Sequence, residues 1–533
     1  MGRAMSSPLQ LRRGGATEAV NPWLIAFTVM LATFMEVLDT SIANVALPHI
    51  AGNLSAGVDE STWVLTSYLV SNAIVLPLTG WFSTLLGRKR FYMGCVVIFT
   101  VSSFLCGLAP NLPLLILFRI LQGAGGGGLQ PVSQAILVES FDRKRQGMAM
   151  AVYGMGVVVA PIVGPTLGGW ITDNYTWRWI FFINIPVGIL SLLLTSLLIA
   201  DPPYLLRRGL KDGLKIDYIG LGLLSVGLGF LQVMLDKGQR DDWFGSKFIV
   251  WCALLAVGGL IGTVIWELRQ KDPVIDLHLL RDRNFAGATF TMYMLGFALY
   301  GSTVLLPILL QTLMGYTAEL SGLVLSPGGL ATLFILPVVG KLLVKHDARW
   351  LVVVGLSILG FGTIMFSRID LSISFGKIVG LWTVSRMGLA FLFVPINVMA
   401  FTYISKQKTN SATGIINLAR NIGGSAGISF VTTMLDRRAQ AHQQILGGHL
   451  TPLDPGYQAA IHGLTGTLMQ HGSGPTEAVQ QAQGLLYGML QQQSAMLAFI
   501  DNFWLLGVIC LAMIPLIFFM KKAKSAHAPV GAH

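Results

Sequence analysis

The chain has 533 residues, of which 53% are hydrophobic and only 11% are charged, and its mean hydropathy is +0.66. Apolar runs recur almost without pause, so the composition excludes a water-soluble domain and indicates a protein that crosses a membrane many times. The net charge of +11 could indicate a nucleic-acid partner, but the positions of the basic residues argue against one.

Fourteen segments are long and apolar enough to span a bilayer, which requires about 20 residues. Because lipid cannot satisfy open backbone groups, these runs predict helices rather than a barrel. The expected fold class is an all-α polytopic membrane protein. The predicted spans are residues 22–47, 62–86, 91–109, 113–137, 147–170, 178–200, 217–236, 247–267, 285–313, 318–340, 350–369, 377–403, 410–434 and 498–520.

The basic residues are unevenly shared between the two sides of these spans. With the N-terminus in the cytoplasm, the cytoplasmic segments hold 25 of the 36 Lys and Arg residues and the outer segments hold 8. The other three, Arg119, Arg386 and Arg420, lie inside apolar segments. This asymmetry follows the positive-inside rule. We therefore expect a multi-pass protein of the lipid bilayer, with both termini in the cytoplasm and no nucleic-acid partner.

The spacing of the spans divides the chain into groups of six, two and six. A cation-rich turn that starts at Gly80 has a weak echo in the second half, at Gly340. Internal repeats are typical of transporters whose halves rock about a central site. We expect a cytoplasmic leader, a six-helix bundle, a linker with two additional spans, a second six-helix bundle with a long periplasmic loop, and a cytoplasmic tail, at residues 1–21, 22–200, 201–284, 285–520 (loop 436–497) and 521–533.

The loop 436–497 is unusually long, since the other connections are short. Leu485, Leu486, Met489 and Leu490 give it a partial helical stripe, so we expect a short amphipathic helix there. Its histidines match no metal-ligand spacing, and the four cysteines of the chain all lie in apolar segments. We therefore expect neither a metal site nor a disulfide.

Two carboxylates, Glu36 and Asp39, lie in the middle of the first apolar segment and are the only acidic residues that fall well inside one. Three residues apart on a helix, they share one face. An unpaired charge at this depth costs roughly 3 kcal/mol or more. A buried carboxylate can exchange a proton near neutral pH, so a proton site is the strongest physical candidate. The alternative is a helix–helix hydrogen bond.

The fourth span carries Arg119 and Gln122 before glycines that permit close helix approach. This pattern resembles the fourth-helix motif of the major facilitator superfamily. The fifth span, residues 160–169, resembles the antiporter motif of that superfamily's drug exporters. Residues 37–48 resemble the first-helix signature of its fourteen-span drug:proton antiporters. Over nearly the whole chain, the sequence is most similar to EmrB-type multidrug exporters.

The resemblance implies the major facilitator fold, with two six-helix bundles plus two extra helices. It also implies an exporter of the bacterial inner membrane that uses a proton gradient and no cofactor. The implied substrates are hydrophobic or amphipathic toxins, drugs, uncouplers or fatty acids. The implied partners are a periplasmic membrane-fusion adaptor and an outer-membrane channel.

Three alternatives stay open. An uptake symporter of the same fold would use similar buried charges, although the antiporter motif counts against it. A membrane enzyme would need a catalytic constellation, and the sequence contains no nucleophile elbow, phosphate loop or zinc motif. A scaffold that transports nothing would use the outer loop to dock partners.

Roles for particular residues follow from the resemblance and from the residues themselves, and Glu36 lies outside the matched signature. Asp39 and Arg119 would couple protons to transport, and Glu36 would take part in protonation or bind cationic substrates. The predicted substrate-cavity residues, which also suit simple packing, are Glu36, Gln122, Phe290, Tyr293, Met294, Phe297, Asn417 and Arg420. The predicted gating and packing residues are Gly80, Gly87, Arg88, Pro161, Gly164, Pro165, Gly168 and Gly169. Thr84 and Leu85 replace an acidic and a basic residue of the superfamily's cytoplasmic turn, so the usual charge latch is incomplete.

Overall fold

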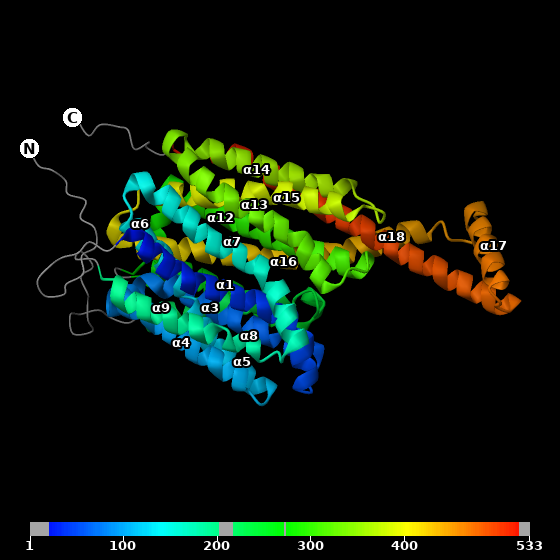
Figure 1. The fold of residues 1–533 in the computed structure, drawn as a ribbon, viewed down its shortest axis with the longest axis horizontal. Coiled ribbons are helices and arrows are strands. Elements are labelled where there is room, and N and C mark those ends of the chain that lie inside the picture. Colours follow the sequence, from blue (N-terminus) through cyan, green and yellow to red (C-terminus); the bar gives the residue numbers. More distant parts are fainter. Residues whose placement is uncertain (1–20, 202–216, 271–272, 522–533) are drawn as a thin grey trace, which may run out of the picture.

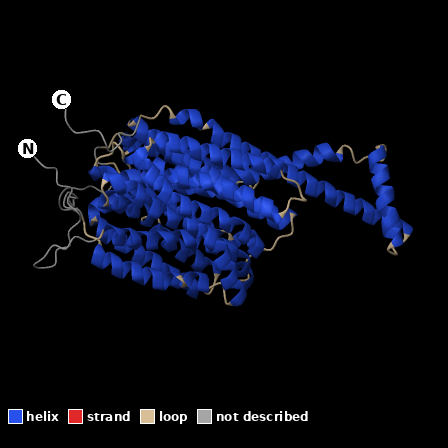
Figure 2. Ribbon diagram, turned by 45° about the horizontal axis from the view of Figure 1, so that its top comes forward, coloured by secondary structure: helices blue, strands red, loops and turns tan. Residues whose placement is uncertain are grey.

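The computed structural model describes residues 21–201, 217–270 and 273–521. Within these ranges the chain consists of helices joined by short connections, and it contains no strand (Figure 2). Thirteen of the helices are long and apolar enough to cross a membrane. The prediction of an all-α polytopic membrane protein is confirmed.

Two groups of helices lie side by side (Figure 1). The N-terminal group consists of α1 (Pro22–Asn53), α2 (Val58–Ser61), α3 (Trp63–Leu86), α4 (Arg88–Leu108), α5 (Leu112–Gly126), α6 (Leu129–Ser140), α7 (Arg143–Asn174), α8 (Trp179–Phe182) and α9 (Asn184–Leu198). The C-terminal group consists of α12 (Arg283–Ile308), α13 (Ala318–Lys345), α14 (Ala348–Met365), α15 (Phe375–Phe401), α16 (Thr409–Gly447), α17 (Pro455–Gln470), α18 (Pro475–Ala512) and α19 (Ile514–Ile517).

Two further helices, α10 (Tyr218–Lys237) and α11 (Lys247–Glu267), lie between these groups in the sequence, and they pack on each other. Helix α10 touches both groups. The amide of Gln232 and the hydroxyl of Ser425 on α16 are 2.8 Å apart, and Asp236 accepts a hydrogen bond from Thr66 on α3. The two additional spans are therefore attached to both groups of helices.

Local sequence signals explain several helix boundaries. Gly87 separates α3 from α4 with a φ of +83°, a conformation that favours glycine. The Asn111 side chain accepts from the Leu114 amide and caps the start of α5. The predicted span 113–137 is interrupted at Gly127 and Gly128, between α5 and α6. The glycines thus end one helix as well as allowing close packing.

Helix α16 contains the predicted span 410–434, but it is more polar than the others and is not one of the thirteen long apolar helices. It packs against α12, α18 and α3. Its polar residues Asn410, Asn417 and Arg420 are buried in protein. Polar side chains at membrane depth are tolerated when they face the interior of a bundle. This explains why α16 can be less apolar than the other thirteen helices.

The predicted outer loop is helical for most of its length. Helix α16 extends to Gly447, α17 follows, and α18 already starts at Pro475, so these helices project beyond one end of the bundle (Figure 1). Proline at the first turn begins both α17 and α18, and Asp454 caps α17. The segment is therefore more helical than the expected single short helix, because Asp454 with Pro455 and Pro475 each start a helix whose apolar stripe is weak.

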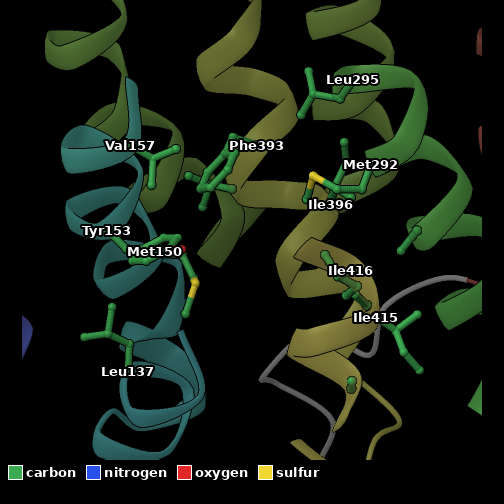
Figure 3. Close-up of a cluster of buried hydrophobic side chains, with 14 of the residues drawn as sticks. Leu137, Met150, Tyr153, Val157, Met292, Leu295, Phe393, Ile396, Ile415 and Ile416 are labelled. Carbon is green, nitrogen blue, oxygen red and sulfur yellow. The ribbon is translucent and has the colours of Figure 1, made fainter. Parts of the chain in front are cut away.

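The two groups meet through an extended apolar core. Figure 3 shows Tyr153 and Val157 of α7 facing Phe393 of α15. The rings of Tyr153 and Phe393 are stacked with their centroids 6.0 Å apart. Close backbone contacts accompany this core, because a Cβ on Gly340 of α13 would lie 3.1 Å from the carbonyl oxygen of Gly147 on α7. The functional candidates lie next to this interface.

Candidate functional site

Asp39 on α1 and Arg119 on α5 form an ion pair inside the N-terminal group. The Arg119 Nη1 donates to Asp39 Oδ2 over 2.5 Å, and the two side chains are 0% and 1% exposed. The guanidinium Nε also donates to the carbonyl oxygen of Val64 at 3.0 Å, and the guanidinium carbon lies 4.3 Å from the centre of the Tyr68 ring. The cation is thus oriented by the backbone and an aromatic face.

The Asp39 carboxylate receives two more hydrogen bonds. Gln122 Nε2 and Asn184 Nδ2 each donate to Asp39 Oδ1 at 2.8 Å. Gln122 also accepts from Arg119 Nη1 at 2.8 Å, so these side chains form a closed triangle. All three of these partners of the Asp39 carboxylate are protein side chains. A proton that binds Asp39 must therefore displace charge-assisted hydrogen bonds from side chains, not hydrogen bonds from water.

Glu36, one helical turn before Asp39, has a separate environment. Its carboxylate accepts from the Tyr68 hydroxyl and the Asn72 amide, each at 3.2 Å, and from the amide of Gln130 on α6. Tyr68 therefore touches both carboxylate sites, because its ring lies against Arg119 while its hydroxyl binds Glu36. A change in the charge of one carboxylate can therefore affect the other through Tyr68.

Polar contacts continue from Glu36 into the C-terminal group. The guanidinium of Arg420 on α16 donates to the side-chain oxygen of Gln130, whose amide binds Glu36. Asn421 donates to the Asn72 side chain at 3.3 Å. The Glu36 site is consequently shared by the two groups of helices.

A second polar bridge lies beside the first. Asn417 of α16 donates to Gln134 Oε1 on α6 at 2.7 Å, and the Gln134 amide binds Asn397 of α15. All three side chains are buried. Any rocking of the two groups therefore has to break or exchange hydrogen bonds at this depth.

The glycines of α5 bring these residues together. A Cβ on Gly123 would lie 2.4 Å from the Tyr68 carbonyl oxygen, and one on Gly126 would lie 2.6 Å from the Tyr68 hydroxyl. On the opposite side, a Cβ on Gly125 would lie 2.6 Å from the amide nitrogen of Phe99 on α4. Larger residues would push α5 away from both neighbours, so the glycine run sets the position of Arg119.

The predicted antiporter motif lies on α7 against the segment that follows Asp39. A Cβ on Gly164 would lie 2.3 Å from Ser41 Oγ, and Ser41 donates to the carbonyl oxygen of Pro161 at 3.2 Å. In a regular helix that carbonyl would bind the amide of residue 165, but Pro165 has no N–H. Ser41 of α1 therefore satisfies a backbone group that the second proline leaves open.

The other two glycines of the motif differ from each other. A Cβ on Gly168 would lie 3.1 Å from the Ile42 side chain, whereas one on Gly169 would have nothing within 4 Å. Close packing of α7 on α1 therefore depends on Gly164 and Gly168 rather than on Gly169.

The predicted gating residues at the other end of the N-terminal group have identified contacts. Arg88 and Glu139 of α6 form a two-pronged ion pair at 2.7 and 2.8 Å, and both side chains are almost fully buried. A Cβ on Gly80 would lie 2.3 Å from Ser411 Oγ on α16. Thr84 donates to the Gly80 carbonyl oxygen at 3.0 Å. This end therefore combines a buried ion pair within one group with a close contact between the two groups.

The aromatic and methionine residues predicted on the ninth span have different neighbours along α12. The Phe290 side chain is 48% exposed and stacks on Tyr293, with their ring centroids 6.5 Å apart. Phe297 packs on Phe430 of α16 at 5.4 Å between centroids, and Met294 lines a small apolar cavity inside the C-terminal group.

Four residues around the two carboxylates did not emerge as candidates from the sequence: Tyr68, Asn72, Gln130 and Asn184; neither did Gln134 and Asn397 of the second bridge. Asn72 and Gln130 lie inside predicted spans, where an unpaired polar side chain is costly, so each needed a partner. That signal would have identified both. Tyr68 and Asn184 gave no comparable signal, because Tyr is common in membrane helices and Asn184 lies close to the start of its helix.

Comparison with known proteins defines the class of the protein. The sequence profile of the Major Facilitator Superfamily matches residues 29–428. The solved structure of the proton:xylose symporter XylE aligns with a TM-score of 0.58 at 13% identity, over 95% of this chain and 97% of that chain. The human organic anion transporter MFSD10 aligns with a TM-score of 0.55 at 12% identity, over 92% and 99%. The chain belongs to the Major Facilitator Superfamily and is a multi-pass membrane transporter, not an enzyme.

Relatives of known name narrow this class. The chain is 37% identical over 513 residues to the fatty acid resistance protein FarB of Neisseria gonorrhoeae, which covers 96% of this chain and 97% of that protein. It is 38% identical over 503 residues to the multidrug export protein EmrB of Haemophilus influenzae, which covers 93% and 95%. The similarity to EmrB-type exporters that the sequence motifs indicated is confirmed, and the chain belongs to the EmrB-type export proteins.

Proposed function

We propose that this protein is a proton-driven exporter of hydrophobic or amphipathic toxic compounds that works by alternating access in the bacterial inner membrane. It needs no cofactor beyond the proton gradient. The names of the relatives, a multidrug export protein and a fatty acid resistance protein, support this substrate class. The observation that carries the proposal is the fully buried Asp39–Arg119 pair beside a second carboxylate, Glu36, that is connected to the C-terminal group through Gln130 and Arg420.

The partners of Asp39 support the proposed proton coupling. While Asp39 is ionised, Arg119 is neutralised and the triangle with Gln122 is complete. Protonation removes the negative charge, so Arg119 loses its counter-ion in a region of low dielectric constant. The helices then favour a different arrangement, and coupling requires only that the proton and the substrate prefer different arrangements.

Glu36 supplies the connection to substrate. It lies between Tyr68 of α3 and Gln130 of α6, and Gln130 is held by Arg420 from the opposite group. A cationic substrate that bound Glu36 would compete with the Gln130 bridge and loosen the contact between the groups. Substrate loading would thus change the same interface that has to open.

The projection formed by α17 and the adjoining ends of α16 and α18 supports an assembly role. These helices extend past the bundle at the end opposite the first residues of α1 (Figure 1). We propose that they contact a periplasmic membrane-fusion adaptor, which leads to an outer-membrane channel. Deleting residues 450–490 should abolish co-purification of the adaptor while membrane insertion persists, and unchanged recovery would refute this part of the proposal.

The direct test is transport by purified protein in liposomes. An imposed pH gradient, acidic on the side of the projecting helices, should drive ethidium toward that side. Movement of ethidium in the opposite direction, together with protons, would identify an uptake symporter instead. Absence of gradient-driven movement with intact partner binding would favour the scaffold.

A further inference from the structure

The C-terminal group contains a buried cation in a setting that parallels the Asp39–Arg119 pair. Arg386 of α15 is 4% exposed, and its Nη2 donates to Ser302 Oγ of α12 at 2.9 Å. Its guanidinium carbon lies 3.6 Å from the centre of the Trp382 ring. In each group, an arginine from the fourth long helix faces the first helix and rests on an aromatic ring.

The two settings differ in the counter-ion. The first helix of the N-terminal group offers the carboxylate of Asp39, whereas α12 offers only the hydroxyl of Ser302. Within the ranges that the structure describes, no carboxylate lies within ion-pair distance of Arg386, and its Nε and Nη1 have no hydrogen-bond partner. A permanent cation in this state lacks the neutralising group that burial requires.

Helix packing does not account for this arginine. Glycines bring α15 close to its neighbours, since a Cβ on Gly388 would lie 2.7 Å from the Gly355 carbonyl oxygen of α14. Thr332 of α13 binds the backbone oxygen of Arg386 at 2.9 Å, not the guanidinium. The helices are therefore held by contacts that leave the two guanidinium N–H groups free for another partner.

We propose that Arg386, Ser302 and Trp382 form a binding site for a group with one negative charge. The group is either the carboxylate of an amphipathic substrate, which rests on the proposed export function, or an inorganic anion. The lining of a small apolar cavity includes Ala298, one helical turn before Ser302 on α12, and Leu392, further along α15 from Arg386. An apolar chain attached to the bound carboxylate would meet this apolar lining.

The test introduces the missing negative charge beside Arg386 by mutation. Ser302→Asp would give Arg386 the carboxylate that its N-terminal counterpart has, and Ser302→Asn has the same size without the charge. Arg386→Gln removes the cation. Each variant is reconstituted, and ethidium transport under a pH gradient is measured with increasing dodecanoate or dodecyltrimethylammonium as competitor.

For wild type and Ser302→Asn, dodecanoate should inhibit at concentrations that agree within threefold. For Ser302→Asp and Arg386→Gln, the inhibitory concentration should rise at least tenfold, while that of dodecyltrimethylammonium stays within twofold. Ethidium transport itself reports that the variants fold, and its absence in wild type would refute the export function rather than this site.

A parallel measurement separates the two sources of negative charge. If an inorganic anion occupies the site, replacing chloride with gluconate should lower the Tm of wild type but not that of Arg386→Gln, while dodecanoate inhibition stays unchanged in all variants. If neither dodecanoate inhibition nor the chloride response depends on residues 302 and 386, the anion site does not exist.

Discussion

Replacing Asp39 with Asn should uncouple transport from the proton gradient. Asn has nearly the same shape, so Gln122 and Asn184 can still donate to its oxygen at the position of Oδ1. The new amide group would face Arg119 Nη1, which now lies 2.5 Å from Oδ2, and two donors would oppose each other. A fully buried cation that loses its partner costs about 3–5 kcal/mol.

A loss of about 3 kcal/mol corresponds to roughly 100-fold in an equilibrium between two conformations. Because Asn cannot be ionised, the variant is also fixed in the form that mimics protonated Asp39. We therefore expect gradient-driven ethidium efflux in proteoliposomes to fall at least about 100-fold, while exchange of labelled for unlabelled ethidium without a gradient stays within a few-fold.

Asp173→Asn is the matched control. It makes the same chemical change at a side chain that is 71% exposed, so efflux should be unchanged. Asp39→Asn should also lower the Tm, because it leaves Arg119 buried and unpaired. Adding Arg119→Gln should recover part of that loss, because no unpaired charge then remains, but should not restore efflux. Gradient-driven efflux by Asp39→Asn within twofold of wild type would refute the reasoning.

Three other substitutions test separate parts of the structure. Glu36→Gln should weaken binding of cationic ethidium at least fivefold and leave a neutral competitor unaffected, as measured by equilibrium binding; equal losses for both would exclude charge selection. Gly164→Val should abolish efflux because it forces α7 from α1, whereas Gly169→Ala, in open space, should retain it. Arg88→Gln leaves Glu139 buried and unpaired, so Tm should fall by several degrees and recover when Glu139→Gln is added; a fall that persists would point to lost packing instead.

The membrane architecture followed from the sequence because hydropathy and helix length are local properties. Thirteen predicted spans correspond to long apolar helices, and the exception, α16, owes its polarity to side chains that face other helices. The projecting helices were underestimated for the opposite reason. Their start signals, such as Asp454 before Pro455, were present, but their apolar stripe was too weak to indicate how far each helix extends.

The site was only partly visible from the sequence. Glu36, Asp39 and Arg119 are charges in apolar segments, so their cost alone marked them. Which groups satisfy these charges depends on contacts between distant segments, such as Gln130 with Arg420, and no periodicity encodes such contacts. The same holds for α12, where Phe297 packs on Phe430 of α16, a contact that no spacing along α12 encodes.

Proton release on substrate binding tests the central claim most directly. Ethidium is added to purified protein in weakly buffered solution, and the pH change is compared between wild type, Glu36→Gln and Asp39→Asn. The proposed coupling predicts that wild type releases protons, that Asp39→Asn releases none, and that Glu36→Gln releases fewer only if Glu36 also carries a proton. Undiminished release by Asp39→Asn would contradict the assignment of Asp39 as the coupling residue.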